Sequence, residues 1–231
     1  MKWSNIHNYH VDKLTHITVI AGNFSSASYD DIYLLSDSEQ QRAKCITNDV
    51  CRSRFVASRA FLRRAIGYIL NAAPYKGDFF IDKFGKPHFP PLHSTLCFNL
   101  SHSGDLIVAA FMQGEAIGID VEMCNRAIPL HLLRYVFNSD EINQILKSDN
   151  WEAAFLRGWT YKEAVLKCIG CGLLLDPKRI QIALNNDGQS LLKATEFSVT
   201  RILNAVYRLI PLTHLQDALG VVAIRQSGVV E

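Results

Sequence analysis

The sequence predicts an α+β fold in which each half of the chain pairs helices with antiparallel strands. Short apolar or β-branched runs separated by brief polar connectors indicate strands, and longer stretches with apolar residues at helical spacing indicate helices. The 231 residues, 48% of them hydrophobic, suffice for one large domain or two small ones. The composition therefore disfavours a disordered or fibrous chain.

Strand and helix signals alternate in the first half of the chain. Ser36 with Glu39 is typical of a helix start, Pro74 follows the end of a long helical pattern, and Gly85 permits a tight turn. The predicted elements are a strand at 16–21, a helix opening at 36–39, a long helix at 48–71, two short strands at 79–82 and 88–89, and a strand at 106–111.

The second half begins helical and closes with strands. Ser139 is a plausible helix cap, and Gly170 with Gly172 ends the longest helix. The predicted elements are a strand at 117–122, helices at 128–136, 139–146 and 151–169, strands at 179–184, 196–202, 205–210 and 220–225, and a turn at 186–188. The connector at 112–115 is the candidate boundary, and the strand, turn and strand at 97–111 resemble the arrangement at 205–225.

Charge and hydropathy indicate neither nucleic acid nor membrane as the main partner. Lys and Arg number 24 against 22 Asp and Glu, a net charge of +2, and no apolar run approaches the roughly 18 residues of a spanning helix. The N-terminus is polar and lacks a signal-peptide pattern. We therefore expect a soluble, cytoplasmic protein whose six cysteines, including the Cys168/Cys171 pair, are reduced thiols rather than disulfides or a zinc site.

The stretch from 42 to 64 is rich in Arg and Lys and contains one acid. A solvated helix face is the simpler interpretation for three of its cations, Arg59, Arg63 and Arg64. Lys44 and Arg54 gain a second interpretation from the motifs that follow.

Two carboxylates are separated by one residue in Gly118-Ile-Asp-Val-Glu122. On a strand, Asp120 and Glu122 project from the same face, and two anions that close together require a cation. Mg²⁺ prefers oxygen ligands and bridges readily to phosphates. An exposed strand end with two solvated acids is the alternative.

Three further motifs are weak when taken alone. In Trp159-x-x-Lys-Glu163-x-x-x-Lys167 the last two residues share a helix face, which is also typical of a surface ion pair, and Trp159 alone would be a core residue. Asn99-Leu-Ser-His-Ser-Gly104 sets hydroxyls and an imidazole at a turn suited to phosphate oxygens, although a structural histidine is common there. Gly85-Lys-Pro87 could be simply a tight hairpin.

The order and spacing of these four motifs together are specific, and the sequence resembles the phosphopantetheinyl transferases of the surfactin-synthetase-activating type. The motifs cover residues 84–167, and the helix at 48–71 fits the same family, whereas the N-terminal strand and the last fifty residues match only in general pattern. The resemblance implies a pseudo-twofold pair of similar subdomains, each a small antiparallel sheet packed against helices, at 1–112 and 113–231. Their interface would form the active site and hold coenzyme A.

The resemblance also implies a chemistry. Asp120, Glu122 and Glu163 would bind Mg²⁺ or Mn²⁺ with the pyrophosphate of coenzyme A, while the serine of an apo acyl or peptidyl carrier protein attacks phosphorus and adenosine 3′,5′-bisphosphate leaves. Lys167 would stabilise the pyrophosphate or protonate the leaving group. Glu163 would take the serine proton, with Glu141 as the rival base, although a helix-capping role explains Glu141 equally well.

The same resemblance assigns contacts to coenzyme A. Its 3′-phosphate would contact a basic cluster of Lys44, Arg54 and His102. Its other phosphates would contact Lys86 and Ser101. Its adenine would contact the turn backbone at Phe84 and Gly85. Relatives often carry a lysine where this chain has Gln41, so part of the 3′-phosphate clamp is missing or replaced. The enzyme would act as a monomer.

Two other functions remain open on the sequence alone. A carboxylate pair with a distant glutamate and lysine is also found in other Mg²⁺-dependent phosphoryl-transfer enzymes, such as nucleases. A non-catalytic module that binds coenzyme A or a carrier protein is the second alternative. The absence of a basic groove lined with aromatic residues speaks against the first, and the intact acidic residues with Lys167 speak against the second.

Overall fold

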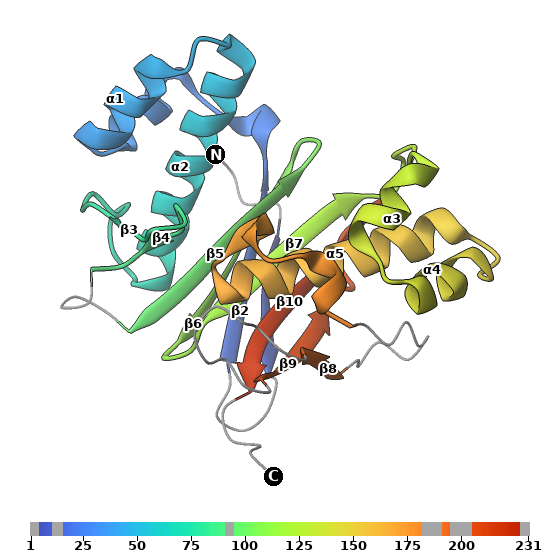
Figure 1. Cartoon of the computed structure of the whole chain (residues 1–231). Helices are drawn as coiled ribbons and strands as arrows, with labels where there is room; N and C mark the ends of the chain where they lie inside the picture. The colour runs from blue at the N-terminus through green and yellow to red at the C-terminus, as the bar shows by residue number, and fades with distance from the viewer. Residues whose placement is uncertain (1–4, 11–15, 91–94, 182–190, 195–204, 227–231) are drawn as a thin grey trace. The chain divides into compact units, whose positions relative to one another are not determined.

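The computed structural model of the chain describes residues 5–10, 16–90, 95–181, 191–194 and 205–226 (Figure 1). The chain divides into two compact units, Met1–Gln113 and Gly114–Glu231. Each unit contains a four-stranded antiparallel sheet and a long helix, so the predicted α+β class is confirmed.

The first unit has the strand order β1-β2-β6-β5, all antiparallel. Its helices and sheet strands are β1 (Asn5–His10), β2 (His16–Asn23), α1 (Asp37–Cys45), α2 (Asp49–Ile69), β5 (Leu96–Ser103) and β6 (Leu106–Gln113). Short 3-10 helices η1 (Phe24–Ser26) and η2 (Tyr29–Leu34) and a two-stranded hairpin of β3 (Phe80–Ile81) and β4 (Pro87–His88) complete it.

Helix caps fix the two helices of this unit where the sequence predicts them. Ser36 and Glu39 form a reciprocal capping box at the start of α1, and the Asn48 side chain accepts a hydrogen bond from the backbone of Cys51 at the start of α2. One face of α2 packs on the sheet through Phe61, Leu62 and their neighbours, all fully buried. Burial of this apolar face, rather than helix propensity, holds α2 in place.

The prediction of a solvated face for Arg59, Arg63 and Arg64 is wrong. Arg63 is fully buried, and its guanidinium donates to Glu39 Oε2 at 2.8 Å and to two backbone carbonyls of the 75–77 segment. Arg59 lies 3.6 Å from the same glutamate, and Arg64 pairs with the buried Asp31. The acidic partners are twenty or more residues away in the chain, so helical spacing could not reveal them.

The second unit has the strand order β7-β10-β9-β8, also antiparallel. Its elements are β7 (Ile117–Met123), η3 (Leu130–Leu132), α3 (Leu133–Val136), α4 (Ser139–Leu146), α5 (Trp151–Ile169), η4 (Gly172–Leu174), η5 (Pro177–Arg179), β8 (Leu191–Ala194), β9 (Ala205–Pro211) and β10 (Ala218–Gln226). Helix α5 lies on this sheet and ends at Gly170, whose φ of 85° is left-handed, as the sequence predicts.

Several predicted details of the second unit need correction. Asn138, not Ser139, caps α4, because its side chain accepts the hydrogen bond of the Glu141 backbone. Arg179, where a strand is predicted to begin, is instead the last residue of the 3-10 helix η5, which the Asp176 side chain caps ahead of Pro177, and residues 182–184 lie outside the described residues. The turn at 186–188 and the strand at 196–202 lie outside the described residues.

The two units share one topology. In each, a strand leads through helices to a hairpin whose second strand pairs with the first strand: β2, α2, β5 and β6 in one unit, and β7, α5, β9 and β10 in the other. The resemblance between 97–111 and 205–225 that the sequence indicates is therefore a pair of equivalent hairpins, β5/β6 and β9/β10.

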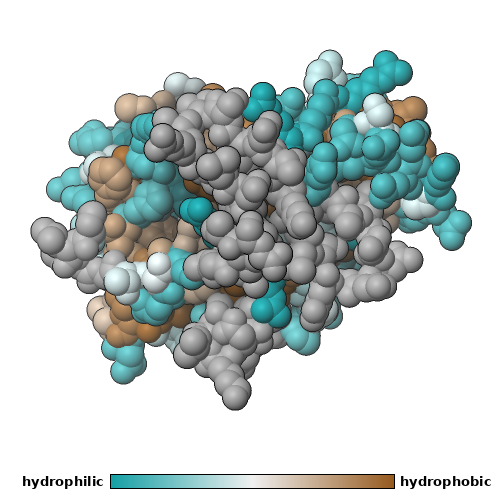
Figure 2. Space-filling view, turned by 60° about the horizontal axis from the view of Figure 1, so that its bottom comes forward, coloured by the Kyte–Doolittle hydropathy of each residue, from teal (hydrophilic) through white to brown (hydrophobic). Residues whose placement is uncertain are grey.

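The described surface carries both hydrophilic and hydrophobic side chains. Hydrophilic and hydrophobic residues are both exposed on the face drawn in Figure 2, and isolated apolar side chains such as Tyr29 and Leu130 are largely exposed. Single exposed apolar residues are ordinary in soluble proteins and indicate no function by themselves. Among the described helices, none combines the length and the apolar character that crossing a bilayer requires.

Candidate active site

A cluster of acidic and basic side chains lies where α5 packs on β7 in the second unit. Gly118 makes this packing close: a Cβ atom built there would lie 2.0 Å from the carbonyl oxygen of Ala164 and 2.4 Å from the backbone nitrogen of Cys168. The helix backbone therefore rests directly on the strand at this glycine. Asp120 and Glu122 follow on the same face of the strand, next to the helix.

Asp120 is almost fully buried and forms an ion pair with the helix. Lys167 Nζ donates to Asp120 Oδ1 at 2.6 Å. The alternative of a simple surface ion pair between Glu163 and Lys167 is therefore not what the structure shows, because Lys167 reaches across to β7. The predicted proximity of Lys167 to the acidic strand is thus present.

Glu122 is held by two groups that sequence reasoning missed. The indole nitrogen of Trp159 donates to Glu122 Oε1 at 3.0 Å, and the guanidinium of Arg126 lies 3.1 Å from both carboxylate oxygens. Trp159 stands four residues before Glu163 and eight before Lys167, so the helical period did contain this signal. Arg126 carried none, because its segment after β7 has no regular pattern.

Glu163 completes the cluster from the helix side. Burial raises the pKa of its carboxyl above the ordinary value, the neighbouring Asp120 raises it further, and Lys167 opposes the shift while Glu122 adds to it. Its Oε1 atom is buried and accepts no hydrogen bond within the described part of the chain. Three carboxylates therefore converge in one electrostatic environment.

The donor set fits a divalent cation, but the carboxylates are not grouped around a metal position as they stand. Within the described residues, no three His, Cys, Asp or Glu side chains are arranged to hold an ion. Asp120 and Glu122 instead engage Lys167, Arg126 and Trp159. The cluster offers only oxygen donors, and one buried Glu163 oxygen has no hydrogen bond. Such a donor set suits Mg²⁺ or Mn²⁺ once the side chains of Lys167 and Arg126 move away from the carboxylates.

Glu141, the rival base, has a structural role. It is buried at the third position of α4, where its carboxylate accepts the Asn138 backbone hydrogen and its Oε2 lies 2.7 Å from Lys162 Nζ. Burial lowers the pKa of Lys162, and the hydrogen bond that its ammonium donates to Glu141 opposes this shift. The geometry favours the capping role that the sequence left open for Glu141.

Two of the predicted coenzyme A contacts lie together in the first unit. The guanidinium of Arg54 stacks over the Phe24 ring at 5.3 Å, and the His102 ring meets the same phenyl edge-on at 5.6 Å. Arg54 also lies 3.6 Å from Asp105. Ser101 differs from its neighbour: the serine is buried and the histidine exposed, because successive side chains of β5 point to opposite faces. Both residues lie on the strand itself rather than in the turn that the sequence predicts.

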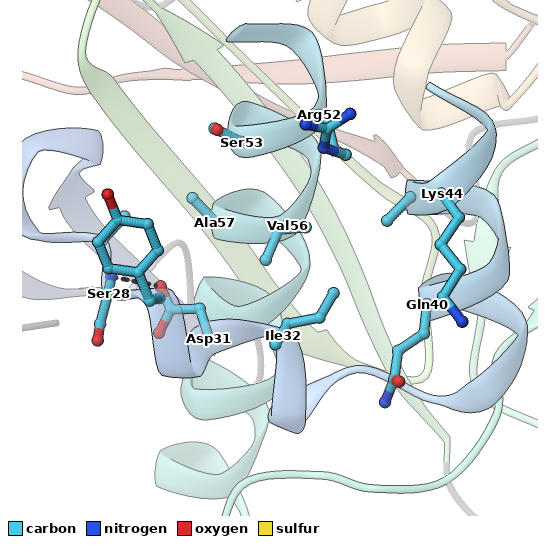
Figure 3. Close-up of a pocket in the computed structure, with 12 residues that line it drawn as sticks. Ser28, Asp31, Ile32, Gln40, Lys44, Arg52, Ser53, Val56 and Ala57 are labelled. Carbon is cyan, nitrogen blue, oxygen red and sulfur yellow. Dashed lines mark hydrogen bonds between the residues drawn. The ribbon is translucent and has the colours of Figure 1, made fainter. Parts of the chain in front are cut away.

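Lys44 lines a pocket of about 630 Å³ between η2, α1 and α2 (Figure 3). Gln40 and Lys44 enter it from α1, and Arg52, Ser53 and Val56 lie along α2 on the other side. Arg54 is not among the residues that line it. The structure thus brings Arg54 to His102 but places Lys44 in a separate recess.

Phe84, Gly85 and Lys86 form the turn between β3 and β4. The Asp82 side chain accepts the backbone hydrogens of Phe84 and Lys86, at 2.8 and 3.0 Å, and Gly85 has a φ of 86°. A left-handed residue is required at that position, which explains the glycine. The tight hairpin that the sequence allowed is therefore present.

Comparison with known proteins identifies similar chains. The sequence model of the 4′-phosphopantetheinyl transferase superfamily matches residues 116–209, which include β7 and α5. The chain is 35% identical to the 4′-phosphopantetheinyl transferase HetI of Nostoc sp. over 65% of each chain. It is 30% identical to the 4′-phosphopantetheinyl transferase Sfp of Bacillus subtilis, over 66% of this chain and 68% of that one.

A third relative comes from a eukaryote. The L-aminoadipate-semialdehyde dehydrogenase-phosphopantetheinyl transferase of Schizosaccharomyces pombe is 29% identical, over 75% of this chain and 73% of its own length. Among solved structures, Thermotoga maritima holo-[acyl-carrier-protein] synthase matches with a TM-score of 0.38 and 17% identity, over 49% of this chain and 64% of that one. A likeness at this level supports no conclusion.

Proposed function

Because the chain belongs to the 4′-phosphopantetheinyl transferase superfamily, we propose that it transfers the phosphopantetheine group of coenzyme A to a serine of an apo carrier protein. The products are the holo carrier protein and adenosine 3′,5′-bisphosphate. The observation that carries the proposal is the convergence of Glu163 with Asp120 and Glu122 beside Lys167. The relatives' names favour this activity over a nuclease-like enzyme or a non-catalytic binding module.

Asp120, Glu122 and Glu163 are the residues that would hold a divalent ion. When bound, Mg²⁺ neutralises charge on the pyrophosphate of coenzyme A. The chain's own residues then have separate tasks. Lys167 stabilises the bridging oxygen of the departing bisphosphate or gives it a proton, since its ammonium already lies in the cluster.

Glu163 is the preferred general base for the carrier serine. It accepts the hydroxyl proton, directly or through water, while the serine oxygen bonds to phosphorus and the pyrophosphate bond breaks. A raised pKa brings this carboxylate closer to neutral pH and makes it a stronger base. Glu141 is a poorer candidate, because its carboxylate is engaged by Lys162 and by the α4 cap.

We assign the 3′-phosphate of coenzyme A to Lys44, Arg54 and His102. Lys86 and Ser101 would contact the other phosphates, and the turn at Phe84 and Gly85 the adenine. The cationic and aromatic group formed by the exposed His102 with the partly buried Arg54 and Phe24 supports this assignment, since a phosphate binds well to guanidinium and imidazolium groups. We also propose that the enzyme acts in the cytoplasm as a monomer.

The test is direct transfer to apo carriers of fatty acid, polyketide and peptide synthesis. With coenzyme A and Mg²⁺, mass spectrometry should show a carrier heavier by one phosphopantetheine, and chelation should abolish the product. Asp120→Asn should reduce the rate by at least about 100-fold, as loss of a group that supports transition-state charge does. Arg134→Gln, at an exposed position of α3, is the control. Unmodified carriers throughout the panel would refute the proposal.

A further inference from the structure

We propose that Arg126 is an internal competitor of the divalent ion: it occupies Glu122 when no metal is bound and thereby weakens the metal affinity of the acidic cluster. The inference rests on the proposed function, in that Glu122 is taken as a metal ligand. It goes beyond that function because it assigns a role to a residue outside the four sequence motifs.

The contact of Arg126 with Glu122 blocks both carboxylate oxygens at once. The same guanidinium nitrogen lies 3.1 Å from Oε1 and 3.1 Å from Oε2. A divalent ion needs at least one of these oxygens, and the like charge of the guanidinium beside it is repulsive. Metal binding at Glu122 therefore requires Arg126 to move away, or else the metal ion must bind against the repulsion of the guanidinium charge.

Arg126 is well placed to leave. Its side chain is 54% exposed whereas that of Glu122 is 13% exposed, so the cation regains water when it separates and the carboxylate stays in place. Arg126 also lies outside the helices and strands, in the segment between β7 and η3. Ion pairs whose cation is largely in solvent are weak, so the competition is mild and reversible.

Trp159 has the opposite role at the same carboxylate. Its indole nitrogen donates to Glu122 Oε1 from within α5, a helix that rests on the strand at Gly118. The indole is uncharged and does not repel a metal ion. Glu122 therefore keeps one fixed partner when Arg126 departs, and its orientation toward Asp120 and Glu163 is retained.

Lys167 sets a useful contrast. Its ammonium pairs with the nearly buried Asp120, and its side chain is only 26% exposed. Removal of this cation would leave three carboxylates crowded in a partly buried place. Arg126 is the more dispensable of the two cations for the structure of the cluster. Its substitution therefore tests competition with the metal ion without disturbing the arrangement of the carboxylates.

The experiment is a Mn²⁺ titration of the full chain, followed by electron paramagnetic resonance of free Mn²⁺, without carrier or coenzyme A. Arg126→Gln should tighten Mn²⁺ binding about two- to fivefold, which is the range set by an exposed ion pair. Arg126→Lys keeps the charge but loses the planar guanidinium. Its Mn²⁺ affinity should therefore lie between those of Arg126→Gln and the wild type. Arg134→Gln removes the same charge from an exposed position of α3 and should change the Mn²⁺ affinity less than twofold, since a charge effect at a distance is screened.

Several results would overturn the inference. Unchanged or weaker Mn²⁺ binding in Arg126→Gln means that Arg126 supports the site rather than competes for it. An equal gain in Arg134→Gln means that only net charge matters, and absence of Mn²⁺ binding in all variants means that Glu122 is no ligand. Thermal unfolding without metal checks that Arg126→Gln is folded.

A parallel transfer assay at saturating Mg²⁺ separates this inference from the proposed function. If wild type modifies carriers and Arg126→Gln shows no gain in Mn²⁺ affinity, the inference fails and the function stands. If Arg126→Gln gains affinity and no carrier is modified, the function fails and the competition stands.

Discussion

Lys162 shows what a single residue contributes to the framework of the second unit. Its ammonium is fully buried and bonds to Glu141 Oε2 and to the carbonyl oxygens of Val136 and Pro177. It therefore ties α5 to the end of α3, to α4 and to η5. The next residue, Glu163, belongs to the acidic cluster, so adjacent positions on one helix serve structure and chemistry.

Replacement of this lysine should be strongly destabilising. Lys162→Met leaves Glu141 as a buried carboxylate without its cation, which typically lowers the free energy of unfolding by about 3–5 kcal/mol. Urea unfolding followed by circular dichroism measures the change. Lys147→Met, at the exposed end of α4, is the control and should stay within about 0.5 kcal/mol of wild type.

Glu163 makes stability depend on pH in a specific direction. Its pKa in the folded protein is raised above the ordinary 4.5, so its contribution to stability is present below 4.5 and is lost as pH rises through the folded value. Without divalent metal, the free energy of unfolding of Glu163→Gln should therefore fall less than that of wild type as pH rises above 4.5. Glu152→Gln, exposed on the same helix, should follow wild type; equal pH profiles for all three would contradict the assignment.

At the scale of elements, the contact of α5 with β7 positions the acidic cluster. No side chain separates the helix backbone from the strand at Gly118, so the helix position is set by the absence of a Cβ atom. The ends of α5 and α2 were predictable because Gly170 and Asn48 are local signals in the chain. The strand partners were not, since pairing such as β10 with β7 joins residues about a hundred positions apart.

Gly118→Ala should push α5 away from β7. The added methyl would meet backbone atoms of Ala164 and Cys168, which cannot rotate aside, so we expect a loss of about 1–3 kcal/mol in the free energy of unfolding. Transfer activity should fall with it, because Glu163 and Lys167 shift relative to Asp120. Gly220→Ala in the same sheet is the comparison: its new methyl would meet the ends of Leu215 and Leu212 side chains, which can adjust, and a larger loss there than at Gly118 would contradict this explanation.

For the molecule as a whole, the motifs predicted which side chains lie together better than they predicted the burial and partners of each one. Asp120, Glu163 and Lys167 were singled out by their motifs together with the family resemblance, and the three side chains lie in one cluster. Trp159 does pack against a core cluster, but its hydrogen bond to Glu122 was not predicted. Arg63 was taken for a solvated residue, because its partner Glu39 comes from a distant part of the chain. Burial and long-range pairing are properties of the folded chain, and a local pattern does not contain them.

The six cysteines provide a test of the whole fold, since the described structure contains them as free thiols with different exposure. Cys45, Cys51 and Cys124 are exposed and should react with a thiol reagent in the native protein, whereas Cys168 is 3% exposed and should react only after unfolding. Burial also raises the pKa of Cys171, which slows its reaction. Spectrophotometric thiol counting with peptide mapping measures this order; rapid labelling of Cys168 would contradict the packing of α5.

The repeated topology of the two units has an evolutionary consequence. In β7 the strand carries Asp120 and Glu122, but its counterpart β2 contains no ionisable side chain from Ile17 to Asn23. If the two units arose by duplication, they then diverged, and the carboxylates of the acidic cluster are found in only one of them. Changes in the first unit would then leave the acidic cluster intact and alter only the contacts proposed there for coenzyme A, which is a route by which such enzymes can change the substrate they recognise.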